Sequence, residues 1–210
     1  QVYIIRNRKR PEILSLENQT TDDDNYILGT IRFIGLVLAQ VLVFNHLNIL
    51  GSINPMVYIL FLFWYPVQEN RTALIAISFL LGFTVDLFSD TMALHSAASI
   101  TAAFFRFPIM RFVFGVNLEF QNFRISGATR VQQLSFLALL IVVHHVAFFS
   151  LEIFSLSNLL LILKRIVFTG ISTFIFSVLL AALFQGEKRK QQGFLSPGGH
   201  PSAEIAMKKL

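Results

Sequence analysis

Long apolar runs alternate with short segments that carry the arginines and lysines, and this alternation restricts the chain to one class of fold. A helix needs about 20 predominantly apolar residues to span the hydrocarbon core of a membrane. Six stretches of the 210-residue chain meet or approach this length. They lie at Ile27–Phe44, Ile53–Val67, Thr72–Phe88, Ala93–Phe105, Val131–Ser150 and Leu159–Phe184. The pattern predicts an all-α, polytopic membrane protein with about six transmembrane helices.

The composition agrees with this class. Hydrophobic residues make up 54% of the chain and charged residues 14%, whereas a soluble domain carries about 25% charged residues. The second and fourth stretches are short for membrane helices. Ala93–Phe105 also contains Ser96, Ser99 and Thr101, so we expect it to be re-entrant or buried within the protein.

Basic residues indicate the orientation, because Lys and Arg in short loops stay on the cytoplasmic side. They precede the first stretch and follow the second, fourth and sixth stretches. Apart from His46, the connections near residues 45–52, 89–92 and 151–158 contain only acidic or neutral residues. The alternation includes the doubtful fourth stretch and predicts that both termini are cytoplasmic. The net charge of +5 then reflects cytoplasmic loops attracted to anionic lipid, and not nucleic-acid binding.

Three regions differ in composition. Residues 1–26 combine a basic cluster with an acidic one and predict a disordered cytoplasmic arm. Residues 27–184 form the predicted transmembrane domain. Residues 185–210 are polar and turn-rich, so we expect a disordered cytoplasmic tail.

The sequence carries no enzyme signature that we can identify. It lacks a Gly-x-Ser-x-Gly elbow, a His-Glu-x-x-His pair and a Walker loop, and it has no cysteine for thiolate or zinc chemistry. We therefore expect no enzymatic activity and no cofactor or metal.

Asp86 is the first site candidate, because ionisable groups at membrane depth usually face the interior of a bundle. Gly82, Asp86 and Asp90 share one helical face, since residues four apart lie above one another. Gly82 would let another backbone approach, and His95 could be the hydrogen-bond partner of Asp86. Asp86 then either caps and pins the fourth helix or contacts a ligand or partner directly.

His144 and His145 lie inside the fifth stretch. Adjacent helix positions point about 100° apart, so the two imidazoles cannot converge on one metal from one helix. We expect one of them to bond a serine or a backbone carbonyl of a neighbouring helix, and the other to face the interior or the lipid headgroups as a neutral ring.

Arg165 lies near the start of the last stretch, beside Lys164. Its long side chain either extends to the membrane surface or points inward to pair with Asp86 or Glu152. Thr169 and Gly170 follow one turn later and supply a small surface for close helix packing.

The segment from Arg106 to Arg130 is predicted to be a long cytoplasmic loop, because Pro108 is expected to end the fourth helix. Phenylalanines lie between its arginines, a composition suited to the headgroup layer. The loop serves either as a lipid anchor or as a docking surface for a filament or partner. Its candidate contacts are Arg106, Arg111, Arg124 and Arg130.

The run from Gly82 to Ser89, followed by Ala93-Leu94-His95-Ser96-Ala97, resembles the glycine, aspartate, small-residue and Leu-His-Ala stretch of the MreD family of rod-shape-determining proteins. The resemblance covers roughly Ile31–Phe184 and includes Pro55, Arg165 and Thr169. Ala93 stands where the family has glycine, and an alanine there argues against an unusual backbone angle at this position.

This resemblance implies a non-enzymatic scaffold of the bacterial cell-wall elongation machinery, located in the inner membrane. Its implied partners are an MreC-like single-span protein, an MreB-like filament, and RodA-like and penicillin-binding synthases. The fold of the family is similar to that of the substrate-binding component of energy-coupling transporters. A vitamin-binding transporter component is therefore the alternative, with Asp86, His95 and Arg165 beginning a pocket.

Overall fold

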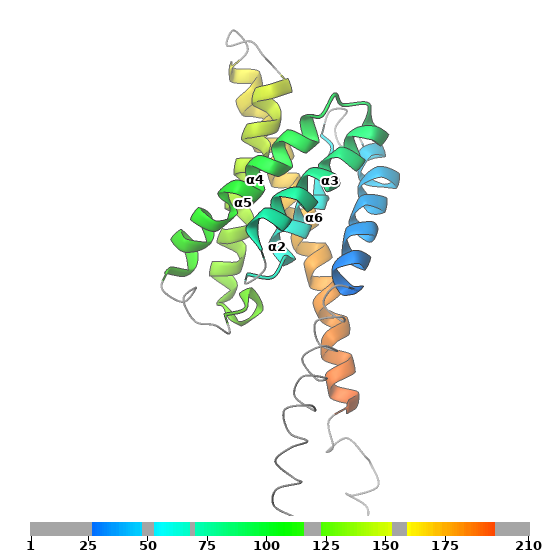
Figure 1. The fold of residues 1–210 in the computed structure, drawn as a ribbon, viewed down its shortest axis with the longest axis vertical. Coiled ribbons are helices and arrows are strands. Elements are labelled where there is room, and N and C mark those ends of the chain that lie inside the picture. Colours follow the sequence, from blue (N-terminus) through cyan, green and yellow to red (C-terminus); the bar gives the residue numbers. More distant parts are fainter. Residues whose placement is uncertain (1–26, 48–52, 68–69, 116–122, 153–158, 196–210) are drawn as a thin grey trace, which may run out of the picture.

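The computed structural model describes residues 27–47, 53–67, 70–115, 123–152 and 159–195 of the chain, and every element in these ranges is an α-helix or a 3-10 helix. The elements in chain order are the N-terminal helix (Ile27–His46, ending in the 3-10 turn η1 at Phe44–His46), η2 (Val57–Ile59), α2 (Leu60–Trp64), α3 (Arg71–Ser89), α4 (Leu94–Phe114), η4 (Ile125–Gly127), α5 (Arg130–Glu152) and α6 (Leu159–Leu195) (Figure 1).

Five helices in the described part of the chain are long and apolar enough to cross a membrane. They are the N-terminal helix, α3, α4, α5 and the Ile162–Leu183 part of α6. This confirms the predicted all-α, polytopic membrane fold. The first, third and fifth predicted stretches agree closely with their helices, because each is one apolar run of helical length with polar residues beyond it.

The second predicted stretch, Ile53–Val67, is not a helix of membrane-spanning length. It consists of irregular backbone, η2 and the five-residue α2. Pro66 stops α2, since the residue before a proline is pushed out of the helical region, and Tyr65 has ψ 135°. Residues 57–63 are all buried, and α2 lies in the middle of the bundle (Figure 1). The prediction of a transmembrane helix here is therefore wrong.

The chain nevertheless passes through the bundle in this segment. The Asn45 side chain donates to the Ser89 hydroxyl at 2.7 Å, so the N-terminal helix and α3 end at the same end of the molecule. Both helices therefore run in the same direction, and the connection between them must return across the bundle. In addition to the five long helices, the chain thus crosses the bundle once more, through the short segment around η2 and α2, which the protein encloses. Irregular backbone is tolerated at membrane depth where protein encloses it, as here.

Three buried side chains from three helices satisfy the backbone of this enclosed segment. Gln40 of the N-terminal helix accepts the Val57 N–H at 2.8 Å and donates to the Pro55 carbonyl at 2.9 Å. Thr173 of α6 accepts the Met56 N–H at 3.0 Å. At the C-terminal end of α2, Arg106 of α4 donates to the Leu62 and Tyr65 backbone carbonyls. Side chains thus replace the hydrogen bonds that a regular helix would have supplied.

The fourth helix is longer than the predicted Ala93–Phe105. α4 continues to Phe114 with Pro108 inside it, so the prediction that Pro108 ends the helix is wrong. Proline removes one backbone hydrogen bond, but packing on both sides of it holds the helix together. Arg106, Ile109 and Met110 are buried around that position.

The last helix also passes its predicted boundary. α6 continues beyond Phe184 to Leu195, so the predicted tail begins inside a helix. Residues 185–192 are glutamine, glutamate, lysine and arginine with one glycine, and most of these are good helix formers. Residues 1–26 and 196–210 lie outside the described residues, and the predictions for them remain predictions.

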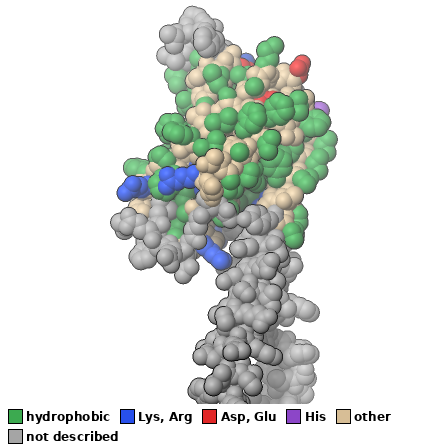
Figure 2. Space-filling model, viewed as in Figure 1, with side chains coloured by type: hydrophobic (Ala, Val, Ile, Leu, Met, Phe, Trp, Pro, Cys, Tyr) green, Lys and Arg blue, Asp and Glu red, His purple; other side chains and the backbone are tan. Residues whose placement is uncertain are grey.

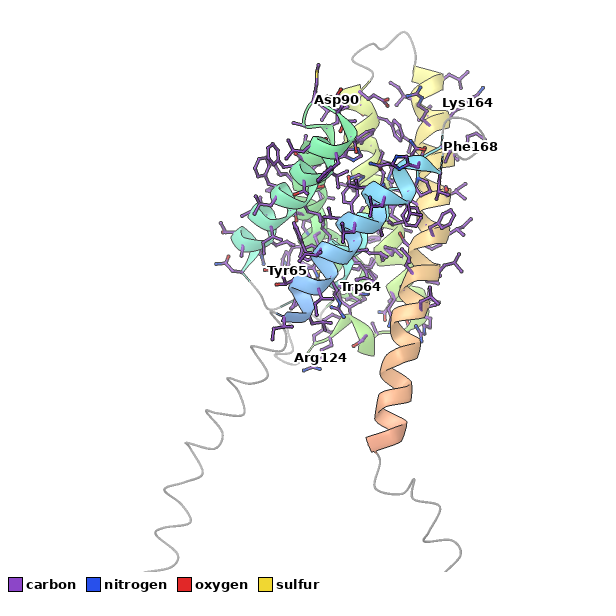
Figure 3. All side chains as sticks on the ribbon, turned by 90° about the vertical axis from the view of Figure 1, so that its right-hand side faces the viewer. Trp64, Tyr65, Asp90, Arg124, Lys164 and Phe168 are labelled. Carbon is purple, nitrogen blue, oxygen red and sulfur yellow. The ribbon has the colours of Figure 1, made fainter. Side chains whose placement is uncertain are left out.

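Charged residues lie at the two ends of the helices and leave an apolar belt between them. On the face shown in Figure 2, most of the lysine and arginine side chains lie at the lower end and the acidic ones at the upper end. Figure 3 places Asp90 and Lys164 at one end and Arg124 at the other. The predicted separation of basic and acidic ends is therefore present, with Lys164 and Arg165 as the basic residues of the acidic end.

Candidate functional site

A tight turn between α3 and α4 brings together several of the predicted site residues. The Asp86 carboxylate is 6% exposed and accepts four hydrogen bonds. They come from Thr91 Oγ1 at 2.7 Å, His95 N at 2.9 Å, Ser96 N at 2.8 Å and Ser96 Oγ at 2.6 Å. A carboxylate at a helix N-terminus satisfies unpaired backbone N–H groups and faces the positive end of the helix dipole. Asp86 therefore caps α4 from the neighbouring helix, as the capping interpretation predicts.

Gly82 allows this joint to close. A Cβ built at Gly82 would lie 2.5 Å from the His95 carbonyl oxygen and 2.6 Å from the Ser96 Cα. No side chain fits at these distances, so the start of α4 can approach α3 this closely only at a glycine. This agrees with the expectation that another backbone would pack at this position.

The turn itself is strained. Asp90, Met92 and Ala93 all have positive φ, at 54°, 29° and 66°. L-residues avoid this region, which costs roughly 1–2 kcal/mol for each of them. Ala93 therefore adopts the left-handed backbone that a glycine would favour. The expectation that the alanine excludes an unusual backbone angle there is wrong. The hydrogen bonds of Asp86 to residues on either side of Ala93 hold the turn in place.

A second polar cluster lies below this turn, in the core. The Tyr58 hydroxyl lies 2.9 Å from Nδ1 of His95 and 2.6 Å from Nε2 of His144, and all three side chains are buried. A tyrosine hydroxyl carries one proton, so it donates to one ring and accepts from the other. Nδ1 of His144 has no partner among the described residues, and an unpaired acceptor costs less than an unpaired N–H. His144 therefore donates to Tyr58, and Tyr58 donates to His95.

The neighbouring His145 belongs to a separate chain of hydrogen bonds. Its Nδ1 lies 2.8 Å from the Ile141 carbonyl, which can only accept, so this nitrogen carries the proton. Its Nε2 then accepts from the Thr173 hydroxyl at 3.2 Å, and Thr173 accepts the Met56 N–H. The backbone carbonyl that His145 bonds belongs to its own helix, α5, and not to a neighbouring helix as predicted, and the contact to a neighbouring helix is made with Thr173 of α6.

The predicted residues at the start of α6 do not join the α3–α4 turn. Arg165 pairs with Glu152 at 2.9 Å in a partly exposed ion pair, so of the two predicted acidic partners it is Glu152 that is used. Thr169 is buried at 3% exposure, one turn before Thr173. Asp86, His95 and Arg165 therefore do not form one pocket among the described residues.

Arg106 is not a cytoplasmic docking or lipid-contact residue. It is 4% exposed, its Nε donates to the Leu62 carbonyl at 2.7 Å, and Nη2 donates to the Tyr65 carbonyl. The reason is that α4 continues past Phe105 and carries the arginine against the carbonyl end of α2. The remaining predicted arginines, Arg111, Arg124 and Arg130, are exposed.

The sequence prediction missed Tyr58 and Gln40, which connect the enclosed segment to the helices around it. The sequence does indicate Gln40, because it is a polar residue within an apolar helix and such residues usually face the interior of the bundle. Tyr58 gave no such signal, since one tyrosine in an apolar stretch is typical of an interfacial anchor.

The polar atoms of these two clusters are largely occupied by one another. In the described part of the chain, no group of three or more His, Asp or Glu side chains could hold a metal ion. The chemistry that the clusters support is hydrogen bonding that fixes α3, α4, α5, α6 and the enclosed segment to one another. Comparison with known proteins adds no assignment, since no family model, curated protein or solved structure matches the chain.

Proposed function

We propose that this protein is a non-enzymatic membrane scaffold of the bacterial cell-wall elongation machinery, of the MreD kind. It resides in the cytoplasmic membrane with both termini in the cytoplasm. It links an MreC-like single-span protein and an MreB-like filament to RodA-like and penicillin-binding synthases, and so contributes to rod shape.

The observation that carries this proposal is the joint between α3 and α4. Gly82, Asp86, His95 and Ser96, which carry the resemblance to MreD, are used to fix two helices and a strained turn in one arrangement. A scaffold needs a surface whose shape does not change when partners bind. Residues that make a rigid joint support such a role better than residues that leave polar groups open to a substrate.

The alternative is a substrate-binding component of an energy-coupling vitamin transporter. That function requires polar groups from several helices that converge on a pocket. Asp86 is bonded to α4, the His95 ring to Tyr58, and Arg165 to Glu152. The contacts that these side chains make within the protein favour the scaffold.

The orientation follows from the distribution of basic residues. Figure 3 places the exposed Arg124 at the end of the bundle opposite Asp90. Arg111 is exposed in the last turn of α4, the end of that helix farther from the Asp90 turn. The positive-inside rule assigns that end to the cytoplasm and the Asp90 turn to the periplasmic side. The exposed arginines are then the part of the described surface best placed to meet a cytoplasmic filament or the inner-leaflet headgroups.

The test is mild crosslinking in native membranes, followed by purification through a C-terminal tag and mass spectrometry. Recovery of an MreC-like protein with wall synthases is the expected result. Recovery of a transport ATPase pair or a bound vitamin would replace the scaffold with the transporter. A tagged, unrelated polytopic membrane protein of the same host, taken through the same steps, controls for non-specific recovery.

Docking through the arginines has its own test. The double variant Arg111→Glu and Arg124→Glu is expected to insert normally and to recover less of the filament protein. The matched control, Arg111→Lys with Arg124→Lys, keeps the charge and is expected to retain recovery. Equal recovery from both variants would assign these arginines to the lipid headgroups instead.

A further inference from the structure

An apolar groove opens to the membrane between α5 and α6. Its volume is about 310 Å³. It is lined by Ala138, Ile141, Val142, His145, Ile166, Val167, Gly170, Ile171 and Phe174. The polar atoms of His145 are bonded to Ile141 and Thr173, so the groove offers an occupant only apolar contacts.

We propose that this groove binds one acyl chain of an anionic phospholipid, whose headgroup lies at Lys164. This inference is independent of the proposed scaffold function, because it depends only on the shape and charge of one lipid-facing surface.

The length of the groove favours an acyl chain over a partner helix. On α6 the lining runs from Ile166 to Phe174, which corresponds to about 12 Å along the helix axis. One leaflet contributes about 15 Å of the hydrocarbon core, whereas a transmembrane helix must pack along about 30 Å. Most of the groove lies in the half of the membrane-spanning Ile162–Leu183 segment that is closer to Lys164. A single acyl chain of that leaflet therefore matches it.

Gly170 makes the groove deep where the chain would lie. A Cβ built there would meet only Ile141 Cγ2, at 3.9 Å, so packing within the protein does not require a glycine. Glycine in a helix interior costs up to about 1 kcal/mol relative to alanine. Val142, Val167 and Ile171, which border the groove, are 50%, 53% and 54% exposed. Gly170 thus deepens the groove at a position where packing within the protein would also accept a larger residue.

The charge at one end of the groove selects the headgroup. Lys164 precedes Val167 by three residues, so it lies one turn before Val167 on the same side of α6, at the end of the groove. Lys164 is exposed and forms no ion pair within the described ranges, whereas the charge of the adjacent Arg165 is balanced by Glu152. The positive charge of Lys164, which Glu152 does not balance, therefore remains beside the groove and complements a lipid with a net negative phosphate group.

The binding test is native mass spectrometry of the full chain in mild detergent, titrated with phosphatidylglycerol or phosphatidylethanolamine of identical acyl chains. The wild-type protein is expected to bind one phosphatidylglycerol in preference to phosphatidylethanolamine. Gly170→Leu fills the groove and is expected to weaken binding of both lipids about tenfold, since several buried methylene contacts are lost. Ile175→Phe, which enlarges an exposed side chain of α6 outside the groove, is the control and is expected to bind as the wild type does.

The headgroup is tested by Lys164→Gln, which is expected to lower phosphatidylglycerol binding about fivefold and leave phosphatidylethanolamine unchanged. Lys164→Arg should restore the preference. Equal binding of both lipids by the wild type, or no effect of Gly170→Leu, would mean annular lipid only and would overturn the proposal. A photoreactive residue in place of Ile171 should crosslink to lipid in native membranes, and a protein adduct there would assign the groove to a helix instead.

Discussion

The Nε of Arg106 donates a hydrogen bond to the Leu62 carbonyl at 2.7 Å, and the same guanidinium donates to the Tyr65 carbonyl. These carbonyls belong to the end of α2, where the last turn of a helix has no backbone partners. The planar guanidinium presents several donors in fixed directions and reaches both oxygens from one position. A buried charge on α4 therefore closes the carbonyl end of the enclosed segment.

Arg106→Lys should destabilise the protein although the charge is retained. The lysine ammonium cannot reproduce the two-pronged contact, and a hydrogen bond from a charged group contributes about 1.5–3 kcal/mol. We expect a lower midpoint of thermal unfolding in detergent micelles. Arg111→Lys, on the exposed side of the same helix, is the control and should leave the midpoint unchanged; equal midpoints for the two variants would contradict this role of Arg106.

Asp86→Asn should also lower the unfolding midpoint. The amide offers one oxygen to four donors, and its NH₂ group faces backbone N–H groups, which leaves buried donors unpaired at about 1–3 kcal/mol each. Asp90→Asn is the control, because Asp90 is exposed and asparagine tolerates its positive φ. If both substitutions shift the midpoint equally, the capping role is wrong.

Two glycines allow a direct comparison of the same substitution. Gly82→Ala introduces a Cβ 2.5 Å from the His95 carbonyl oxygen and should push α3 and α4 apart. Gly170→Ala meets its nearest atom at 3.9 Å and should stabilise α6 by up to about 1 kcal/mol through helix propensity. Unfolding midpoints should therefore move in opposite directions, and a shift of the same sign would show that the α3–α4 contact is looser than described.

Ala93→Gly is expected to stabilise the protein. The substitution removes the steric cost of a positive φ at 66°, roughly 1 kcal/mol. Glycine also gives the unfolded chain more conformational entropy, which offsets part of this gain. The control is Ala97→Gly, which lies in the helical part of α4 and should destabilise by about 1 kcal/mol. Thermal unfolding of both variants measures the two effects. A lower unfolding midpoint for Ala93→Gly would contradict the steric cost assigned to the positive φ of Ala93.

Tyr58→Phe should destabilise the core by removing the hydroxyl between His95 and His144. Both rings would lose a buried partner, at about 1–3 kcal/mol for each unsatisfied group. A double-mutant cycle with His144→Phe separates this effect from changes in packing. Additive losses would indicate that the hydroxyl and the His144 ring do not interact.

Much of the fold was predictable because lipid imposes simple requirements on a chain. A run of apolar residues of sufficient length must form a helix to satisfy its own backbone, so the N-terminal helix, α3 and α5 could be placed closely. The same argument failed at Ile53–Val67. There the hydrogen-bond partners come from distant residues such as Gln40 and Thr173, and a local pattern does not reveal them.

The candidate site was predictable to a similar extent. Gly82 and Asp86 share a helical face, and this periodicity already placed a small residue beside an acid. Sequence spacing does not show which groups meet the acid, and it assigned Arg106 to a loop because Pro108 was expected to end the helix. Packing around the proline decided otherwise.

The sequence by itself determined the membrane class of this protein, the number of passages through the bundle and the separation of its basic and acidic ends. Each of these follows from the cost of placing unpaired backbone or charge in hydrocarbon, which is a property of composition and order along the chain. Only the tertiary structure decided that one passage is a short enclosed segment, that Tyr58 joins two histidines and that Arg106 caps α2. Those contacts join residues far apart in the chain, and their energies exist only once the helices have packed.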